Sequence, residues 1–147
     1  MSTDTQTTEN KSVVEDLYKE LDDHNADAFH EYLSDDFTTG IYRSGTEEGI
    51  DGREGMKELW EEYWSAFPDF SEKSMELIAE GDRVAVFREE QGTHEGEFRG
   101  IEPTGEEITF EYAGYFVVED GEITHGHFHG NMLNLLKQLG VESPIPQ

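Results

Sequence analysis

In residues 71–94, SEKSMELIAEGDRVAVFREEQGTH, the hydrophobic period changes from that of a helix to two, and this change determines the fold class. Apolar and polar residues alternate on both sides of EGD at 80–82, which predicts two antiparallel strands joined by a tight turn. The same alternation returns in EITFEYAGYFVVEDGEI at 107–123 and in ITHGHFHG at 123–130. The C-terminal half of the chain is therefore predicted to be a strand meander.

The residues before this stretch mostly have helical spacing. Three helices are predicted, at 13–21, 28–33 and 52–66, with one short strand candidate, TTGIYRSGT, at 38–46. Asn10 or Ser12 can cap the first helix. This element order predicts an α+β fold in which helices cover one face of a curved antiparallel sheet. Such a sheet leaves a mouth lined from both sides, so we expect a pocket.

The first ten residues, MSTDTQTTEN, contain no apolar residue after Met1 and are predicted to form a disordered acidic tail. Residues 11–147 are predicted to form a single domain, because neither a repeat nor a linker interrupts them. Cysteine is absent, which excludes disulfides and thiolate chemistry. Because there is no signal-like N-terminus and no run of about 18 apolar residues, we expect a cytoplasmic protein.

The chain is strongly acidic, with 35 acidic and 10 basic residues and a formal net charge of −25. Repulsion of this size destabilises a compact state in dilute salt, where the Debye length is about 10 Å at 0.1 M. The destabilisation is much smaller at 1 M, where the Debye length is about 3 Å. The composition therefore predicts a halophilic protein. Nucleic acid and anionic membranes are not expected as partners, because the chain would repel them.

Five short motifs occur in an order found in one known family: FPDF at 67–70, EGDRVAV at 80–86, GTHEGEFRGIEPTG at 92–105, DGEI at 120–123 and LLKQLG at 135–140. Together they resemble the SnoaL-like polyketide cyclases, or ester cyclases, of the nuclear transport factor 2-like superfamily. The resemblance implies a cone-shaped curved sheet wrapped around three N-terminal helices, with a deep apolar pocket for a small apolar molecule. It also implies a homodimer or a higher homo-oligomer.

Characterised members of this family close a ring in a polyketide ester by an intramolecular aldol reaction, without a cofactor or a metal. The resemblance implies an aspartate general acid/base near the last strand and a pocket histidine in the GTH motif, which is His94 here. The aspartate does not carry over, because its position is Asn131, and a position usually held by tryptophan is His127. The sequence therefore leaves open whether the chain is a cyclase-like lyase or isomerase.

An aldol closure needs a base that removes a proton next to a carbonyl, and histidine is the side chain that suits this role best here. Asn131 cannot accept a proton at a useful pH, although its amide can donate a hydrogen bond to an oxyanion. Histidine, with an ordinary pKa of about 6.5, is the natural substitute. Because side chains two apart on a strand share a face, we expect His125, His127, His129 and Asn131 to project together.

On the GTH strand, the same rule places Val84, Val86, Arg88, Glu90 and His94 on one face. If both faces line one cavity, the candidate catalytic groups are His94, His127, His129 and Asn131. Candidate substrate-binding residues are Arg88, Glu90, Trp60 and Trp64, although the two tryptophans are expected mainly in the core and a structural salt bridge is favoured for Arg88 over binding a substrate carboxylate. The opposite faces would then pack against a partner, with Phe87, Tyr115, Val117 and Phe128.

Three functions stay open at this point. The first is a cofactor-independent acid/base enzyme acting on an apolar, carbonyl-bearing small molecule. The second is a non-catalytic small-molecule-binding protein with the same fold, in which the alternating histidines form only a polar face. The third is a histidine-ligated metal-binding protein, because same-face histidines about 7 Å apart can ligate one ion, although the family resemblance implies no metal.

Overall fold

The computed structural model describes residues 3–43, 46–48, 50 and 52–142. Its elements follow in the order α1 (Thr3–Asp22), α2 (Ala28–Tyr32), β1 (Leu33–Arg43), β2 (Thr46–Glu48), α3 (Gly52–Ala66), β3 (Ser71–Glu80), β4 (Arg83–Thr93), β5 (Glu107–Glu119), β6 (Glu122–Gly130) and α4 (Met132–Gln138). The predicted α+β class is confirmed, with a curved sheet that does not close.

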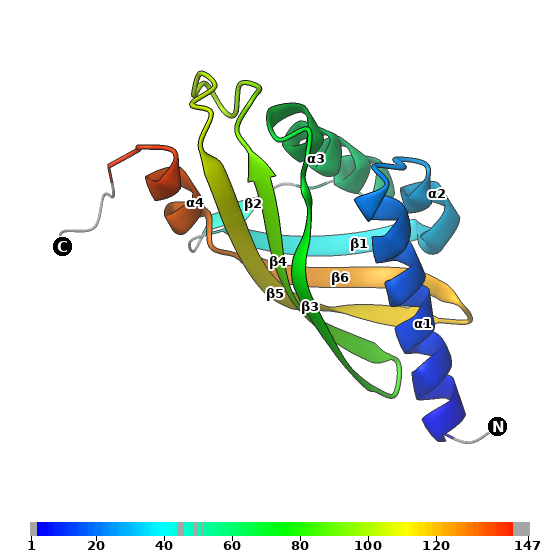
Figure 1. Ribbon diagram of the computed structural model, residues 1–147. Helices are drawn as coiled ribbons and strands as arrows, with labels where there is room; N and C mark the ends of the chain where they lie inside the picture. The colour runs from blue at the N-terminus through cyan, green and yellow to red at the C-terminus, as the bar shows by residue number, and fades with distance from the viewer. Residues whose placement is uncertain (1–2, 44–45, 49, 51, 143–147) are drawn as a thin grey trace.

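The sheet has the strand order β2-β1-β6-β5-β4-β3. Strands β3 to β6 form the predicted antiparallel meander, but β1 pairs with β6 in parallel, with Gly40 beside His127. Figure 1 shows β1 running along β6, although most of the chain separates them. The expectation of a wholly antiparallel sheet was therefore wrong, because hydrophobic period does not reveal which distant strands become neighbours.

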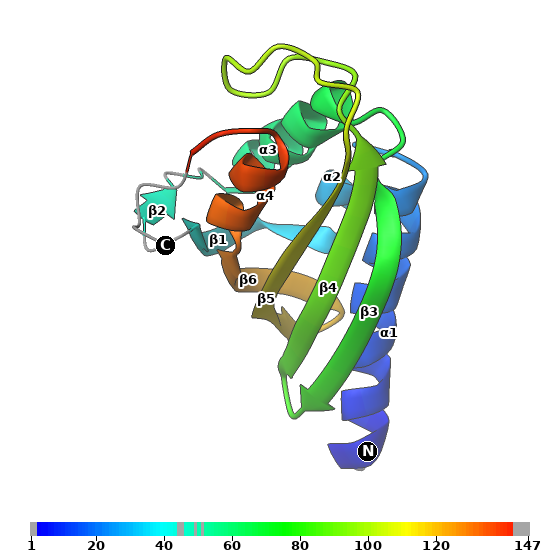
Figure 2. The ribbon, with the colours of Figure 1, turned by 60° about the vertical axis from the view of Figure 1, so that its left-hand side comes forward.

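Helices α1 and α3 cover one face of the sheet, which we call the inner face. Helix α1 contacts strands β3 to β6, whereas α3 contacts β1. Figure 2 shows α1 running beside β3, with α3 and α4 near the other end of the sheet. Leu17 and Tyr18 of α1 and Trp60 and Tyr63 of α3 are all buried in the resulting core. Among the described residues, no helix is long and apolar enough to span a membrane.

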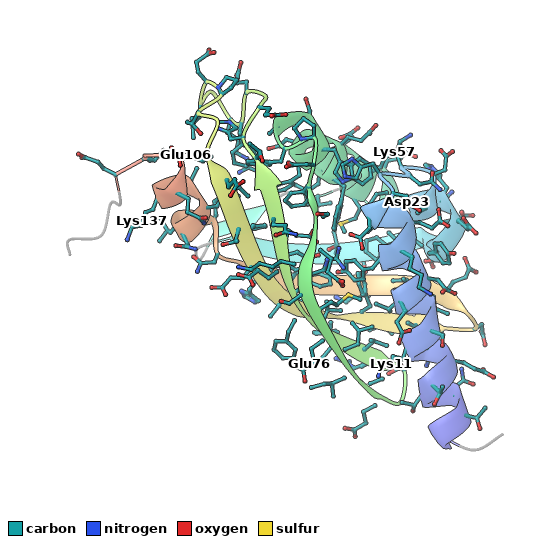
Figure 3. The ribbon with its side chains drawn as sticks, in the orientation of Figure 1. Lys11, Asp23, Lys57, Glu76, Glu106 and Lys137 are labelled. Carbon is teal, nitrogen blue, oxygen red and sulfur yellow. The ribbon has the colours of Figure 1, made fainter. Side chains whose placement is uncertain are left out.

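Alternation along the strands determines which side chains face the helices. On β4 the even-numbered residues from Val84 to Glu90 are buried, as the sequence predicted. The opposite, outer face of the sheet carries two exposed apolar side chains, Ile78 at 55% and Phe87 at 49%. Glu76 lies on the same face, and Figure 3 shows it on the side of β3 away from α1. The sheet therefore has a packed inner face and a free outer face in the single chain.

The first helix begins earlier than predicted. Residues 3–10, expected as a disordered tail, form the first turns of α1. Asn10 is buried, its side-chain amide donates to the backbone oxygen of Gly81, and its Oδ1 accepts from Gln6. These polar contacts hold the segment against the turn between β3 and β4, and they leave no apolar periodicity from which a helix could be predicted. Residues 1 and 2 of the predicted tail lie outside the described part of the chain.

Other boundaries agree more closely or shift by a few residues. The third helix has the predicted bounds, Gly52–Ala66. The second helix ends at Tyr32, and β1 starts at Leu33 rather than at residue 38, because the segment pairs with Ile123 of β6. Residues 44–45 of the predicted short strand are outside the described residues. A further short helix, α4, follows the last strand.

Candidate functional site

An apolar cavity of about 70 Å³ lies between the inner face of the sheet and the helices. Its wall is formed by Leu17, Tyr18, Leu21, Phe29, Leu33, Met56, Leu59, Trp60, Tyr63, Phe70, Phe110, Tyr112, Phe116, Phe128 and Gly130. Ligand pockets usually measure roughly 300–1,000 Å³, so a ligand larger than a small ring must displace wall side chains. Of the wall residues, Leu59, Tyr112 and Gly130 are partly exposed, so movement of the Leu59 and Tyr112 side chains would widen the cavity.

Two residues of this apolar wall are tyrosines, and each carries a polar hydroxyl group. The hydroxyl oxygens of Tyr18, from α1, and Tyr112, from β5, lie 3.2 Å apart. The Tyr112 hydroxyl is also 3.3 Å from Oε1 of Glu90, on the neighbouring strand β4. Glu90 is fully buried. A chain of hydrogen bonds therefore leads from the cavity to a carboxyl group inside the protein.

Arg88 holds this carboxyl in place. Its Nε donates to Oε1 of Glu90, and its Nη2 lies 3.4 Å from Oε2 of the same group. The guanidinium also contacts Asp22 at 2.5 Å, Glu72 at 3.3 Å and the sulfur of Met75 at 3.3 Å. The guanidinium also lies over the ring of Tyr18, 4.4 Å from its centroid. Arg88 thus forms the structural ion pair that the sequence left as an alternative to binding a substrate carboxylate.

Burial changes the proton affinities in this cluster. Burial raises the pKa of the Glu90 carboxyl, although the charge of Arg88 and its hydrogen bonds act in the opposite direction. Burial also raises the pKa values of the Tyr18 and Tyr112 hydroxyls above their usual range, so neither ionises near neutral pH. Of Glu90, Tyr18 and Tyr112, only Glu90 is a carboxyl, and a carboxyl releases its proton far more readily than a tyrosine hydroxyl does.

His94 is buried on the inner side, as predicted, but it is not among the residues of the cavity wall. The backbone N–H of Thr104 donates to its Nδ1 at 3.1 Å, so the imidazole proton lies on Nε2. Among the described residues, no partner lies within hydrogen-bonding distance of this buried Nε2. The ring packs on Phe67, 5.5 Å between centroids. The lone pair of Nδ1 is therefore engaged by Thr104, in the loop that precedes β5.

The alternating histidines share one face, but it is the outer face. His127 stacks on Tyr115 at 5.8 Å and meets His129 at 5.2 Å, while Nδ1 of His125 lies 2.8 Å from the Thr38 hydroxyl. The expectation that His127 and His129 share a cavity with His94 was wrong, because Phe128 takes the inward position. For the same reason Phe128 does not belong to the outer face with Phe87, Tyr115 and Val117.

Asn131 is exposed and caps a helix. Its side-chain oxygen accepts from the backbone N–H of Asn134, and its amide donates to Glu111 at 3.0 Å. It is not among the cavity wall residues. The side chain at this position therefore acts as the N-cap of α4, a role that asparagine fills as well as aspartate does.

The two candidate tryptophans separate in the structure. Trp60 lines the cavity, whereas Trp64 is not among its wall residues and stacks on His24 with ring centroids 4.8 Å apart. Tyr18 and Tyr112 were not among the site residues predicted from the sequence. Both stand at core positions in the apolar patterns of α1 and β5, and a buried tyrosine usually needs a polar partner for its hydroxyl. That requirement was the available signal.

In the described part of the chain, no group of three or more histidine and carboxylate side chains is placed to hold a metal ion. The proposal of a histidine-ligated metal site therefore has no geometric support among these residues.

The chain was compared with known proteins. The model of the SnoaL-like polyketide cyclases matches residues 12–139. AclR from Streptomyces galilaeus, described as a candidate hydroxylase, is similar at 26% identity and a TM-score of 0.80, over 96% of this chain and 91% of AclR. IdmH from Streptomyces antibioticus, described as a candidate polyketide cyclase, is similar at 25% identity and a TM-score of 0.74, over 90% of this chain and 99% of IdmH.

A third structure, of a candidate SnoaL-like polyketide cyclase from Jannaschia sp. CCS1, has 22% identity and a TM-score of 0.78 and covers 96% of each chain. At this identity the likeness concerns the fold alone. No curated protein matches the chain at a significant level.

Proposed function

Because the chain belongs to the SnoaL-like polyketide cyclase family, we propose that it is a cofactor-independent acid/base enzyme acting on an apolar, carbonyl-bearing small molecule. The observation that carries the proposal is the apolar cavity, whose wall includes Tyr18 and Tyr112, two residues with hydroxyl oxygens 3.2 Å apart. The apolar wall favours an uncharged substrate, and a hydroxyl donor can stabilise negative charge that develops on a carbonyl oxygen. The reaction type is proton removal beside the carbonyl, followed by ring closure.

An alternative function is supported by one specific observation. The family's aspartate position is Asn131, which is exposed and caps α4 instead of facing the cavity. A protein that kept the apolar cavity but lost the base would bind small molecules without changing them. The two functions differ in whether a bound ketone exchanges its protons with solvent, and this difference can be measured.

The test uses neutral ketones of increasing size: cyclopentanone, cyclohexanone and 2-tetralone. Each is mixed with the protein in D₂O and concentrated KCl, and NMR follows the loss of the protons next to the carbonyl. Positioned acid/base groups accelerate proton transfer by about 10²- to 10⁴-fold. We therefore expect exchange at least about 10²-fold faster than in buffer for one ketone of the series. Heat-denatured protein is the control.

Ligand-observed NMR on the same samples detects binding. Saturable binding of these ketones with exchange equal to that in buffer would support the binding protein and reject the enzyme. Exchange that is equally fast with the heat-denatured control would also reject it, because the rate would then not depend on the folded cavity.

A further inference from the structure

The hydrogen bonds from the cavity to Glu90 form a chain with two possible proton arrangements. A hydroxyl carries a single proton, so Tyr112 cannot donate to both Tyr18 and Glu90 at the same time. When Glu90 is ionised it only accepts, so Tyr112 donates to it and Tyr18 donates to Tyr112. When Glu90 is protonated it can donate to Tyr112, and the Tyr18 proton is then free to point into the cavity.

We propose that Tyr18 and Tyr112 form a proton relay between a substrate in the cavity and Glu90, which supplies the basic carboxylate that this chain lacks at Asn131, the family's aspartate position. This inference rests on the proposed function, because it assigns the groups that would carry out its proton transfer. Tyr18 and Tyr112 would touch the substrate, and Glu90 would act through them as a positioning residue. The distances of 3.2 and 3.3 Å between successive oxygens are those of long hydrogen bonds, and they allow both arrangements.

The proton transfers balance without a further reactant. As the C–H bond beside the substrate carbonyl breaks, its proton passes to the Tyr18 oxygen, the Tyr18 proton passes to Tyr112, and the Tyr112 proton passes to Glu90. The electron pair of the broken bond forms an enolate, which attacks a second carbonyl of the same molecule and gives an alkoxide. The relay then runs in reverse and protonates that alkoxide. The product is an isomer of the substrate, and Glu90 is ionised again.

The surroundings of Glu90 suit this role. Arg88 faces it from the same strand and Tyr112 from β5, while Tyr18 of α1 contacts the Tyr112 hydroxyl and the Arg88 guanidinium. Two further carboxyls, Asp22 of α1 and Glu72 of β3, face the same guanidinium from its solvent side. One positive charge therefore meets three carboxyls, an arrangement that favours a proton on the buried one and disfavours an anionic substrate. The relay thus predicts a neutral ketone or ester as substrate.

The first test measures the carboxyl directly in the ligand-free protein. Infrared difference spectra between acid and neutral pH contain the C=O stretch of each carboxyl that gains a proton. We expect a band from a buried carboxyl that is absent in Glu90→Gln, shifted in frequency in Tyr112→Phe, and unchanged in Tyr115→Phe. Tyr115 is the matched control because it lies on the same strand but on the outer face. An identical band in Tyr112→Phe would overturn the relay.

The second test uses the ketone exchange rate as a function of pH. In the wild type, exchange should rise with pH as Glu90 ionises, with a midpoint above the ordinary carboxyl pKa of about 4.3. Tyr112→Phe should lower the rate about 10²-fold, and Glu90→Gln should remove the rise with pH. A Glu90→Gln variant that retains the rate and the pH profile would overturn the inference.

These outcomes separate the two proposals. Absence of exchange in the wild type would reject the proposed function and with it the catalytic use of the relay, even if the infrared band behaved as expected. Exchange that persists in Tyr112→Phe would keep the proposed function and reject the relay. If Glu90→Gln does not fold, Tyr112→Phe carries the test, since it removes one hydroxyl and keeps the ring that packs on Phe110 and Phe128.

Discussion

Replacing Arg88 by methionine should make the stability of the protein depend on pH in a way that can be worked out from the structure. The guanidinium side chain is fully buried and is the cation that faces the fully buried Glu90. Methionine keeps an apolar stem but leaves Glu90 without a positive partner. Removing one partner of a buried ion pair usually costs about 3–5 kcal/mol.

Protonation of Glu90 limits the loss of unfolding free energy in the Arg88→Met variant. A carboxyl without its cation avoids the buried charge by taking up a proton, and pH 7 lies about 2.7 units above the ordinary pKa of about 4.3. At about 1.36 kcal/mol per unit, the loss at pH 7 is then at most about 4 kcal/mol, and at pH 5 about 1 kcal/mol. Asp22 and Glu72 add little, because their side chains are 34% and 41% exposed and are screened by solvent.

The sign of the pH dependence follows from linkage. In the variant, the pKa of Glu90 is raised by folding, so its stabilising contribution is fully present below the unfolded-state pKa and is lost as the pH rises through the folded-state value. The difference from wild type must therefore widen from pH 5 to pH 7. Urea unfolding in a fixed concentration of KCl, followed by far-UV circular dichroism, measures this difference.

Two further variants make the prediction specific. Adding Glu90→Gln to Arg88→Met removes the uncompensated charge and should recover at least about half of the loss at pH 7. Arg83→Met, on the same strand but over the Tyr115 ring at 5.0 Å, should cost less than about 1 kcal/mol. A loss below about 1 kcal/mol for Arg88→Met at pH 7, or a difference that does not change with pH, would refute this account of the buried cluster.

Three other predictions follow from particular features. Burial opposes ionisation of Asp69, but hydrogen bonds from the backbone and hydroxyl of Thr93 outweigh this effect and lower the Asp69 pKa. The loss of stability in Asp69→Asn, measured by urea unfolding, should therefore be largest above about pH 4 and smaller at lower pH. Gly114→Ala should lower the melting temperature by at least about 4 °C, because its Cβ would lie 2.0 Å from the backbone oxygen of His127 and 2.6 Å from the Phe128 ring; an unchanged value would contradict this packing. Because the net charge is −25, the urea midpoint should rise between about 0.1 M and about 2 M KCl, and a flat or falling midpoint would argue against halophily.

The sequence predicted the elements well where a single period ran through a segment. The bounds of α3 and the meander from β3 to β6 came directly from the change of period at residue 71. The parallel pairing of β1 with β6 could not be predicted in this way, since periodicity is a local property and this contact joins two strands that lie far apart in the sequence. The early start of α1 depends on polar contacts of Asn10, which leave no apolar pattern.

For the site, alternation showed which residues share a face but not which face is turned inward. On β6 the choice is made by packing: Phe128 fills the space beside Phe116 and Tyr112, while Gly126 allows the Phe116 ring to come close. His127 and His129 then necessarily face outward. The sequence did place Arg88, Glu90 and His94 on the inner face, but the role of Tyr112 depends on the register between β4 and β5.

The most direct test of the central claim asks on which face of the sheet the chemistry takes place. The ketone exchange rate should be measured for wild type, for the inner-face variant Tyr18→Phe/Tyr112→Phe, and for the outer-face variant His125→Gln/His127→Gln/His129→Gln. The proposed relay predicts that exchange falls to the buffer rate in the inner-face variant and stays close to the wild-type rate in the outer-face variant. Exchange that survives loss of both tyrosine hydroxyls but disappears with the three histidines would contradict it.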